Sequence, residues 1–343
     1  MAGRATLGVI RGRIPLSYPN YQSFKIGICL KLSIFMHSEP HMPYIKLSIL
    51  LVFALCTVYI HYRGRQRLGF WRQLTDHSTF MAPINCFCYL FSTLPARPYL
   101  PLQQFPELRT LNDNWQRIRT EALALSNDGE IKASERYDDL GFNSFFKTGW
   151  KRFYLKWYDQ PHPSAARLCP YTTELLQGIP SVKAAMFASL PPGSRLVRHR
   201  DPFAGSVRFH LGLSTPQSEA CYIEVDGQRY SWRDGEAVLF DETYLHHAEN
   251  ATKHQRIILF CDIERPMRFR FAAWCNRLIS RLLLGAASSP NQDGDRTGAL
   301  NRLFRYVQAV RLFGKRIKAQ SRVGYYALKW LLFGGLLLGW LLS

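Results

Sequence analysis

Residues 198–213 read RHRDPFAGSVRFHLGL, directly after the turn-like LPPGS and leading into an apolar run. Side chains two positions apart on an extended strand point to the same face, so His199 and Asp201 can bind one ion together. Two simpler interpretations compete: His199 as a surface histidine in a basic turn, and Asp201 as the residue that starts an Asp-Pro turn. The rest of the sequence must decide between them.

The chain around this stretch has the pattern of an all-β domain. Short alternating or apolar runs are separated by turn residues such as PPG, DG and RDG, which predicts a sandwich or barrel. The runs are KRFYLKWY, KAAMFASL, SVRFHLGL, CYIEV, QRYSW, EAVLF and QRIILFCDI. Before them, residues 112–126 predict a helix with Trp115, Ile118, Ala122 and Leu125 on one face, capped by Asn112 or Asp113.

The run EAVLF is followed by DETYLHH, which adds His246 and His247, and then by Arg256 at the start of an apolar strand. Neighbouring strand residues face opposite ways, so only one of the two histidines can be a ligand. Two histidines and one carboxylate on a β scaffold are typical of the facial triad of Fe(II) oxygenases. We therefore expect His199, Asp201 and His246 to bind the metal. Open coordination positions would take a 2-oxo acid and O₂, and the Arg256 guanidinium would bind the far carboxylate of 2-oxoglutarate.

Composition limits the remaining choices. The 343 residues are 47% hydrophobic and carry a net charge of +19, which predicts attraction to a polyanion, either a nucleic acid or an anionic membrane. Much of the basic excess lies beside apolar segments and no nucleic-acid-binding module is recognisable, so we expect no nucleic-acid partner. The eight cysteines are scattered without a Cys-x-x-Cys pair, which indicates mostly buried thiols in a reducing compartment.

Two segments are long and apolar enough to cross a bilayer. Residues 43–62 are followed by Arg63, Arg65 and Arg67, and residues 323–343 are preceded by a basic stretch. A buried core helix is the competing interpretation of each. The positive-inside rule places residues 63–322 in the cytoplasm and both termini outside.

The expected organisation has six parts. They are 1–41, a leader with Met42 as an alternative start; 43–62, a transmembrane helix; 63–111, an interfacial segment and linker; 112–264, the oxygenase domain; 265–322, basic amphipathic helices; and 323–343, a transmembrane helix. The helices of 265–322 are either a solvated charged face or, as we expect, a membrane-surface element beside anionic lipid.

Three stretches, LPPGSRLVRHRDPFAGSVRFHLGL, WRDGEAVLFDETYLHHAEN and QRIILFCDIERP, resemble the aspartyl/asparaginyl β-hydroxylase family. The resemblance is greater to its membrane-bound branch, the lipid A 2-hydroxylases of Gram-negative bacteria, and covers residues 43–343. It implies a mainly β fold, a double-stranded β-helix of the jelly-roll, cupin-like kind, flanked by helices and by an N-terminal and a C-terminal transmembrane helix.

The same resemblance implies site roles. His199 and His246 become iron ligands and Arg256 the partner of the distal 2-oxoglutarate carboxylate. His210 and Arg208 match residues near the other carboxylate and the substrate, and Trp150 matches a pocket tryptophan. The animal peptide-hydroxylase branch has a glycine in place of Asp201 and a serine in place of Ala188. The assignment of Asp201 as a ligand therefore rests on the lipid branch and on the chemistry of the triad, and Arg256 needs another residue to help it bind the distal carboxylate.

The implied activity is an Fe(II)- and 2-oxoglutarate-dependent dioxygenase that uses O₂. We expect it to hydroxylate the 2-position of a secondary acyl chain of lipid A at the cytoplasmic face of the bacterial inner membrane. Hydroxylation of another lipid, such as an ornithine lipid, or of protein Asp and Asn side chains remains open. A membrane-tethered jelly-roll binding or sensing module is the non-enzymatic alternative.

Overall fold

The computed structural model describes residues 42–134, 139–158 and 162–342. The chain divides into two units at residues 49/50, and the described part of the first unit is only the beginning of helix α2. The expected leader, 1–41, lies outside the described residues. The second unit contains every strand of the described chain.

The strands form two antiparallel sheets. The six-stranded sheet has the order β1-β8-β5-β10-β3-β2, and the four-stranded sheet has the order β4-β9-β6-β7. The strands are β1 Tyr99–Leu100, β2 Lys151–Trp157, β3 Val182–Leu190, β4 Arg195–His199, β5 Ser206–Ser214, β6 Cys221–Val225, β7 Gln228–Ser231, β8 Ala237–Phe240, β9 His246–Asn250 and β10 Arg256–Glu264. From β3 to β10 the chain passes back and forth between the sheets, which is the double-stranded β-helix predicted from the sequence.

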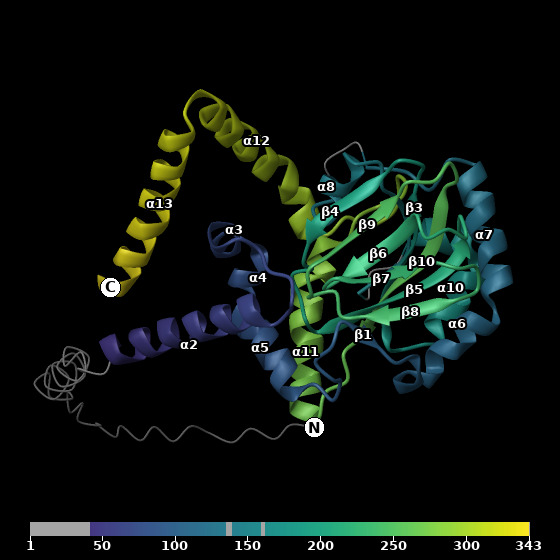
Figure 1. Cartoon of the computed structure of the whole chain (residues 1–343), viewed down its shortest axis with the longest axis horizontal. Coiled ribbons are helices and arrows are strands. Elements are labelled where there is room, and N and C mark those ends of the chain that lie inside the picture. The colour runs from purple at the N-terminus through teal and green to yellow at the C-terminus, as the bar shows by residue number, and fades with distance from the viewer. Residues whose placement is uncertain (1–41, 135–138, 159–161, 343) are drawn as a thin grey trace, which may run out of the picture. The chain divides into compact units, whose positions relative to one another are not determined.

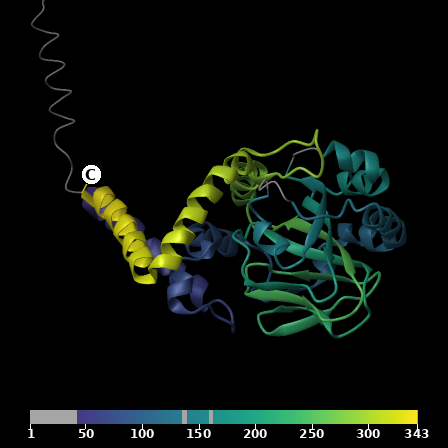
Figure 2. The ribbon, with the colours of Figure 1, turned by 90° about the horizontal axis from the view of Figure 1, so that it is seen from above.

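Alternation along the strands creates two apolar layers. On β10, Ile258 and Phe260 face the space between the sheets, whereas Leu259 and Cys261 pack on the opposite side of the six-stranded sheet. Helices α6 (Arg109–Asp113), α7 (Trp115–Asn127) and α10 (Pro170–Gln177) cover this outer side, as Figures 1 and 2 show. The inner layer, between the two sheets, is therefore where polar side chains can form a site.

Some boundaries differ from those expected. Helix α7 begins at Trp115 with Asn114 as its N-cap residue, because Asn112 and Asp113 end the preceding helix α6. The expected cap at 112 or 113 is therefore wrong, although Ile118, Ala122 and Leu125 are buried as predicted. The expected linker also contains β1, which pairs with β8 at the edge of the six-stranded sheet.

The remaining helices lie at the two ends of the sequence and in the loops. They are α2 Met42–Tyr62, α3 Phe70–Leu74, α4 His77–Phe80, α5 Ala82–Phe91, η1 Leu102–Gln104, η2 Pro106–Leu108, α8 Asn143–Phe146, α9 Pro163–Leu168, α11 Arg270–Leu283, η3 Gly285–Ala287, α12 Ala299–Gln320 and α13 Arg322–Leu342. Two stretches, Tyr44–Tyr62 and Arg322–Leu341, are long and apolar enough to cross a membrane, and almost none of their residues are buried. Among the described residues the cysteines are free thiols.

Candidate metal and anion site

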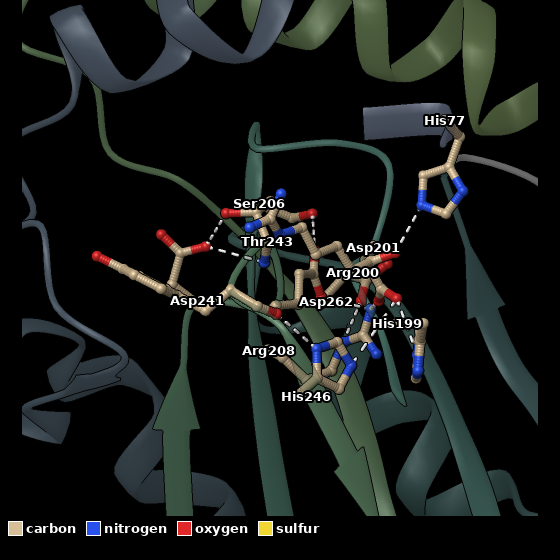
Figure 3. A network of polar contacts seen from close by, with 12 residues as sticks. His77, His199, Arg200, Asp201, Ser206, Arg208, Asp241, Thr243, His246 and Asp262 are labelled. Carbon is tan, nitrogen blue, oxygen red and sulfur yellow. Dashed lines mark hydrogen bonds and ion pairs between the residues drawn. The ribbon is translucent and has the colours of Figure 1, made fainter. Parts of the chain in front are cut away.

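Three ligand-type side chains meet where strand β4 ends and strand β9 begins. Nε2 of His199 lies 3.4 Å from Oδ1 of Asp201, and Nε2 of His246 lies 4.0 Å from the same oxygen. One donor atom from each residue lies within 4.8 Å of the others. Figure 3 shows the three residues converging on one point. The geometry therefore suits one metal ion bound on one side by two imidazoles and a carboxylate.

The strand pairing explains how the histidines meet. His199 and His246 are direct partners in the β4–β9 ladder, and their ring centroids are 4.2 Å apart. Asp201 lies in the loop beyond β4, which ends at His199, so the expectation that both residues share an extended strand is wrong. The loop turns the Asp201 carboxylate back towards the two rings instead.

Hydrogen bonds orient both imidazoles. Nδ1 of His199 lies 2.7 Å from the Val197 carbonyl oxygen, and Nδ1 of His246 lies 2.9 Å from that of Tyr244. A carbonyl oxygen only accepts, so each Nδ1 donates its proton to it, and Nε2 is the ring nitrogen that faces Asp201. Burial lowers the pKa of His246 to about 3, with neighbouring His199 contributing, so this ring is neutral at pH 7.

His247 does not join the triad. Its Nδ1 lies 4.0 Å from Oε1 of Glu224, on the face of the four-stranded sheet that points away from the other sheet. The prediction that only one of the adjacent histidines can be a ligand is consistent with this geometry, and His246 is the one whose side chain reaches Asp201.

Arg208 lies at the centre of an acidic cluster. Its guanidinium binds Oδ2 of Asp201 at 2.7 Å, Oδ1 of Asp262 at 2.9 Å and the carboxylate of Glu242. Burial alone would raise the pKa of Asp201, but Arg208 and the two histidines outweigh it and lower that pKa. Burial raises the pKa of Glu242, and its acidic neighbours raise it further. Arg208, expected from the resemblance near the cofactor's other carboxylate and the substrate, lines the same pocket and also pairs with the candidate ligand Asp201.

Arg256 has the opposite environment. It is 2% exposed, its Nε has no hydrogen-bond partner, and no carboxylate pairs with it in the part of the chain that the structure describes. Its Nη1 lies 3.5 Å from the Ala188 carbonyl oxygen, and its guanidinium carbon lies 4.3 Å from the Trp232 ring centroid. Burial lowers its pKa to about 10. A buried cation without a counter-charge is costly and calls for an anion.

His210 is a second buried polar group that awaits a partner. It is 6% exposed, and neither ring nitrogen has a hydrogen-bond partner among the described residues. Burial lowers its pKa well below the usual value, with the positive charges of Arg208 and Arg256 contributing, so the ring is neutral. Aromatic rings surround it, with Phe240 and Phe260 centroids at 5.0 and 5.3 Å. Its orphaned nitrogens suit the oxygens of a bound acid.

One pocket between the sheets joins these groups. It is lined by Phe142, Phe145, Trp150, Leu196, His199, Asp201, Arg208, His210, Ile223, Trp232, Phe240, His246, Ala248, Arg256, Ile258 and Phe260. Trp150 stacks on Phe142 with a centroid distance of 4.8 Å, and Phe145 lies 4.6 Å from the His199 ring. All the sequence-predicted site residues line this pocket, the metal triad and Arg256 together.

Other contributors were not predicted. Trp232, Phe145, Glu242 and Asp262 were missed, although Asp262 carried a usable signal. It lies six residues after Arg256 in the same strand, and the residues between them are all apolar; this even spacing places both side chains on the inner face.

The residues present fit a metal ion and a 2-oxo acid. Two imidazole nitrogens and a carboxylate supply the donor set for a divalent transition metal. Arg256 and His210, with unsatisfied polar atoms in the same pocket, supply the contacts that an acidic ligand needs.

Comparison with known proteins bears on the family of the segment that carries the site. Residues 112–266 match the family model described as Aspartyl/Asparaginyl beta-hydroxylase, a segment that contains α7 and every described strand except β1. The family expected from the sequence is therefore supported for the segment that carries the site.

Several curated proteins are similar to this chain. An ornithine lipid ester-linked acyl 2-hydroxylase from Rhizobium tropici is 38% identical over 130 residues, covering 37% of this chain and 46% of the relative. The aspartyl/asparaginyl beta-hydroxylase of Homo sapiens is 26% identical over 186 residues, covering 52% and 24%. Aspartate beta-hydroxylase domain-containing protein 2 of Xenopus tropicalis is 28% identical, covering 52% and 50%. The chain spans half or less of the length of these relatives.

Among solved structures, a prolyl-4-hydroxylase from Pseudomonas putida aligns with a TM-score of 0.32 and 19% identity, over 45% of this chain and 87% of that one. The cupin domain of Cnp3 from Schizosaccharomyces pombe aligns with a TM-score of 0.24 and 10% identity, over 34% and 64%.

Proposed function

We propose that this chain is an Fe(II)- and 2-oxoglutarate-dependent hydroxylase of an acyl chain in a membrane lipid. The observation that carries the proposal is the pairing, in one pocket, of the His199–Asp201–His246 triad with the buried Arg256. A metal triad alone would suit many proteins. A buried guanidinium without a carboxylate partner in the same pocket points to an acidic co-substrate bound next to the metal.

Each side chain then has a defined task. The histidines and Asp201 hold the metal, and Arg208 keeps the Asp201 carboxylate charged and oriented through the 2.7 Å ion pair. Arg256 binds the far carboxylate of 2-oxoglutarate, with Trp232 rather than a serine hydroxyl as its neighbour. The neutral His210 ring would donate one N–H to the other carboxylate of 2-oxoglutarate.

The cofactors supply the oxidising power: 2-oxoglutarate, O₂ and a C–H bond become succinate, CO₂ and a C–OH group. Such chemistry requires that water stay out of the pocket. The aromatic lining, with Trp150 between the rings of Phe142 and Phe146, provides that exclusion.

Exposed apolar surface favours a lipid substrate. On helix α11, Phe271, Trp274, Leu278 and Leu282 are 69%, 58%, 41% and 65% exposed, at helical spacing, while Ala272, Asn276 and Ser280 are buried. The exposed side is thus more apolar than the buried side, the reverse of an ordinary surface helix. Arginines flank the stripe, as in helices that lie in an anionic membrane surface. Together with the two candidate spans, this surface supports a position of the chain at the membrane, where acyl chains are.

The basic flanks favour a catalytic domain on the cytoplasmic side of the inner membrane. The flank after the first candidate span carries less free positive charge than its sequence suggests. Arg63 is paired with Asp241 at 2.6 Å, and its side chain is only 6% exposed. Arg65 and Arg67 remain exposed after the first candidate span. The basic stretch from Lys315 to Arg322 forms the flank of the second candidate span.

Two substrates are proposed within this class. The 2-position of a secondary acyl chain of lipid A follows from the resemblance of the sequence. An ester-linked acyl chain of an ornithine lipid has separate support in the Rhizobium tropici relative, which is named for that reaction. The two lipids share an ester-linked acyl chain and differ in the headgroup, so the headgroup decides between them.

The test uses the full-length protein purified in detergent and supplied with Fe(II), 2-oxoglutarate and O₂. Lipid A, an ornithine lipid and an Asp-containing peptide are incubated separately, and His246→Ala is the matched control. We expect one added oxygen on an acyl chain of one of the lipids, with equimolar succinate, both lost in the variant. Oxygen added only to the peptide would contradict a lipid substrate, and an absence of metal binding would instead favour a binding or sensing module.

A further inference from the structure

Residues 63–91, called the brace below, follow helix α2 directly and lie outside the segment 112–266 that matches the hydroxylase family. They contain α3, α4 and α5. The sequence predicted an interfacial segment for this part of the chain. In the structure the brace contacts the loops on both sides of the metal triad.

Asn85 of α5 clamps the loop that follows Asp201. Its Nδ2 donates to the Pro202 carbonyl oxygen at 3.0 Å, and its Oδ1 accepts from the Ala204 backbone N–H at 2.9 Å. Asn85 is 1% exposed. Cys88, one helical turn further, packs with Ala204 in a small apolar cluster. One side chain thus fixes two backbone positions directly after a metal ligand.

Arg200, which lies between His199 and Asp201, is also held by the brace. Arg200 is 2% exposed, and its Nη1 donates to Oε1 of Gln73 at 2.9 Å. Its backbone carbonyl oxygen lies 2.6 Å from Nε2 of His77. Figure 3 shows His77 reaching Arg200 from a helix on the side opposite the triad. The turn from His199 to Asp201 therefore lies between the candidate metal-binding side chains and the brace.

The loop before His246 is held by the beginning and end of the brace. Arg63 binds Oδ2 of Asp241 at 2.6 Å and donates to the Thr243 hydroxyl at 2.9 Å. The Tyr89 hydroxyl donates to the same Thr243 oxygen at 2.7 Å, and the Arg63 guanidinium lies 4.0 Å from the Tyr89 ring centroid. The side chains of the Arg63–Asp241 pair are almost completely shielded from solvent, where ion pairs constrain geometry more than at the surface.

We propose that the brace positions the metal ligands, so that the metal centre is completed by a segment outside the family domain. Asn85 is the principal positioning residue, with His77 and Gln73 supporting it. Metal affinity depends on ligand orientation, and outer contacts that orient ligands change it by about 10–100-fold. The inference rests on the proposed function, since it needs the triad to bind a metal.

The test measures Co(II) binding to the full-length protein in detergent by the visible absorption of the bound ion. In Asn85→Ala we expect affinity to fall about 10–100-fold and the absorption spectrum to change, because the ligand loop loses its clamp. The matched control is Asn291→Ala. Asn291 makes the same kind of two-way clamp on the Tyr154 backbone, with distances of 2.7 and 2.8 Å, on strand β2. That variant should lose similar thermal stability and keep its Co(II) affinity within about threefold of the original, since it touches no ligand loop.

A second variant covers the case in which Asn85→Ala does not fold. His77 is half exposed, so His77→Ala should fold and weaken Co(II) binding several-fold without a large stability loss. Equal Co(II) affinity and an unchanged spectrum in the folded brace variants would overturn the inference and leave the proposed function intact. Failure of the unmodified protein to bind Co(II), with no difference from His246→Ala, would overturn the proposed function itself.

Discussion

Replacing Arg256 by methionine should make the ligand-free protein more stable and at the same time remove its affinity for 2-oxoglutarate. Methionine keeps much of the length of the side chain and its contact with Trp232 but carries no charge. An arginine retained for stability would give the reverse result, so the substitution separates a structural role from a binding role.

The magnitude follows from the burial of the guanidinium. Burial lowers the pKa of Arg256 from the ordinary arginine value to about 10, and each pKa unit corresponds to about 1.4 kcal/mol, so the charged form costs the folded state about 3 kcal/mol. Both values lie above neutral pH, so the side chain is charged in the folded and unfolded states and the full cost applies at pH 7. The cost begins to fall only as the pH rises through about 10, where the folded-state side chain starts to lose its proton.

Removing that cost should raise the melting temperature of the ligand-free protein by about 3–8 °C, after allowance for imperfect packing of the methionine. Loss of the charge partner of a buried carboxylate typically costs about 2–5 kcal/mol, so affinity for 2-oxoglutarate should fall at least about 30-fold. Saturating 2-oxoglutarate should therefore stabilise only the original protein, by roughly 3 kcal/mol at 100 times its dissociation constant.

The assay is thermal unfolding of the full-length protein in detergent, with Co(II) in place of iron so that no turnover occurs, across a 2-oxoglutarate titration. Arg152→Met is the control, because Arg152 is equally buried but pairs with Asp139 at 3.0 Å. The free energy of unfolding of this variant should fall by about 3–5 kcal/mol, and its affinity for 2-oxoglutarate should be unchanged. If Arg256→Met is destabilised as strongly as the control and still binds 2-oxoglutarate normally, the assignment of Arg256 is refuted.

Three further substitutions test other parts of the account. His246→Ala should abolish Co(II) binding and hydroxylation, whereas His247→Ala should retain both within about threefold, as metal titration and product analysis will show; equal losses would contradict the assignment of the ligand. Asp241→Ala should cost about 3–5 kcal/mol in unfolding experiments, because two buried arginines lose their partner, and a cost below 1 kcal/mol would argue against the pair. Burial opposes ionisation of Asp241, but the two arginines hold its pKa below the ordinary 3.8, so this stabilisation is present above that pH and is lost as the pH falls below it. Replacing both Trp274 and Leu278 by serine should lower lipid turnover in vesicles several-fold without changing 2-oxoglutarate affinity, and unchanged turnover would count against a membrane role for α11.

Much of the fold could be predicted from the sequence because the strands are short alternating or apolar runs separated by turn residues. The runs from KRFYLKWY to QRIILFCDI coincide with strands β2, β3, β5, β6, β7, β8 and β10 to within a residue or two. Strand β1 could not be predicted, because two residues between prolines carry no periodicity, and only the exposed edge of β8 makes them a strand.

The site residues could be predicted where a residue type in a given spacing has one characteristic chemical use. Histidines spaced for a facial triad and an arginine opening a buried strand were recognised from the sequence, and the structure brings them into one pocket. The acidic cluster around Arg208 and the contacts of Asn85 were not, because these partners lie 54 and 119 residues apart in the chain and local sequence does not encode them. The brace was assigned to the interface for its apolar helix α5, yet the same helix carries the one polar residue that clamps the ligand loop.

The central claim is that one oxygen atom of O₂ enters a lipid acyl chain while the other enters succinate. Its most direct test is incubation of the full-length protein with Fe(II), 2-oxoglutarate, isotopically heavy O₂ and either lipid A or an ornithine lipid, followed by mass spectrometry of lipid and succinate. The account predicts one heavy oxygen in each hydroxylated acyl chain and one in each succinate, in equal amounts, and neither product with His246→Ala. Succinate formed without labelled lipid would contradict the substrate class, and an absence of label in both products would contradict the enzyme.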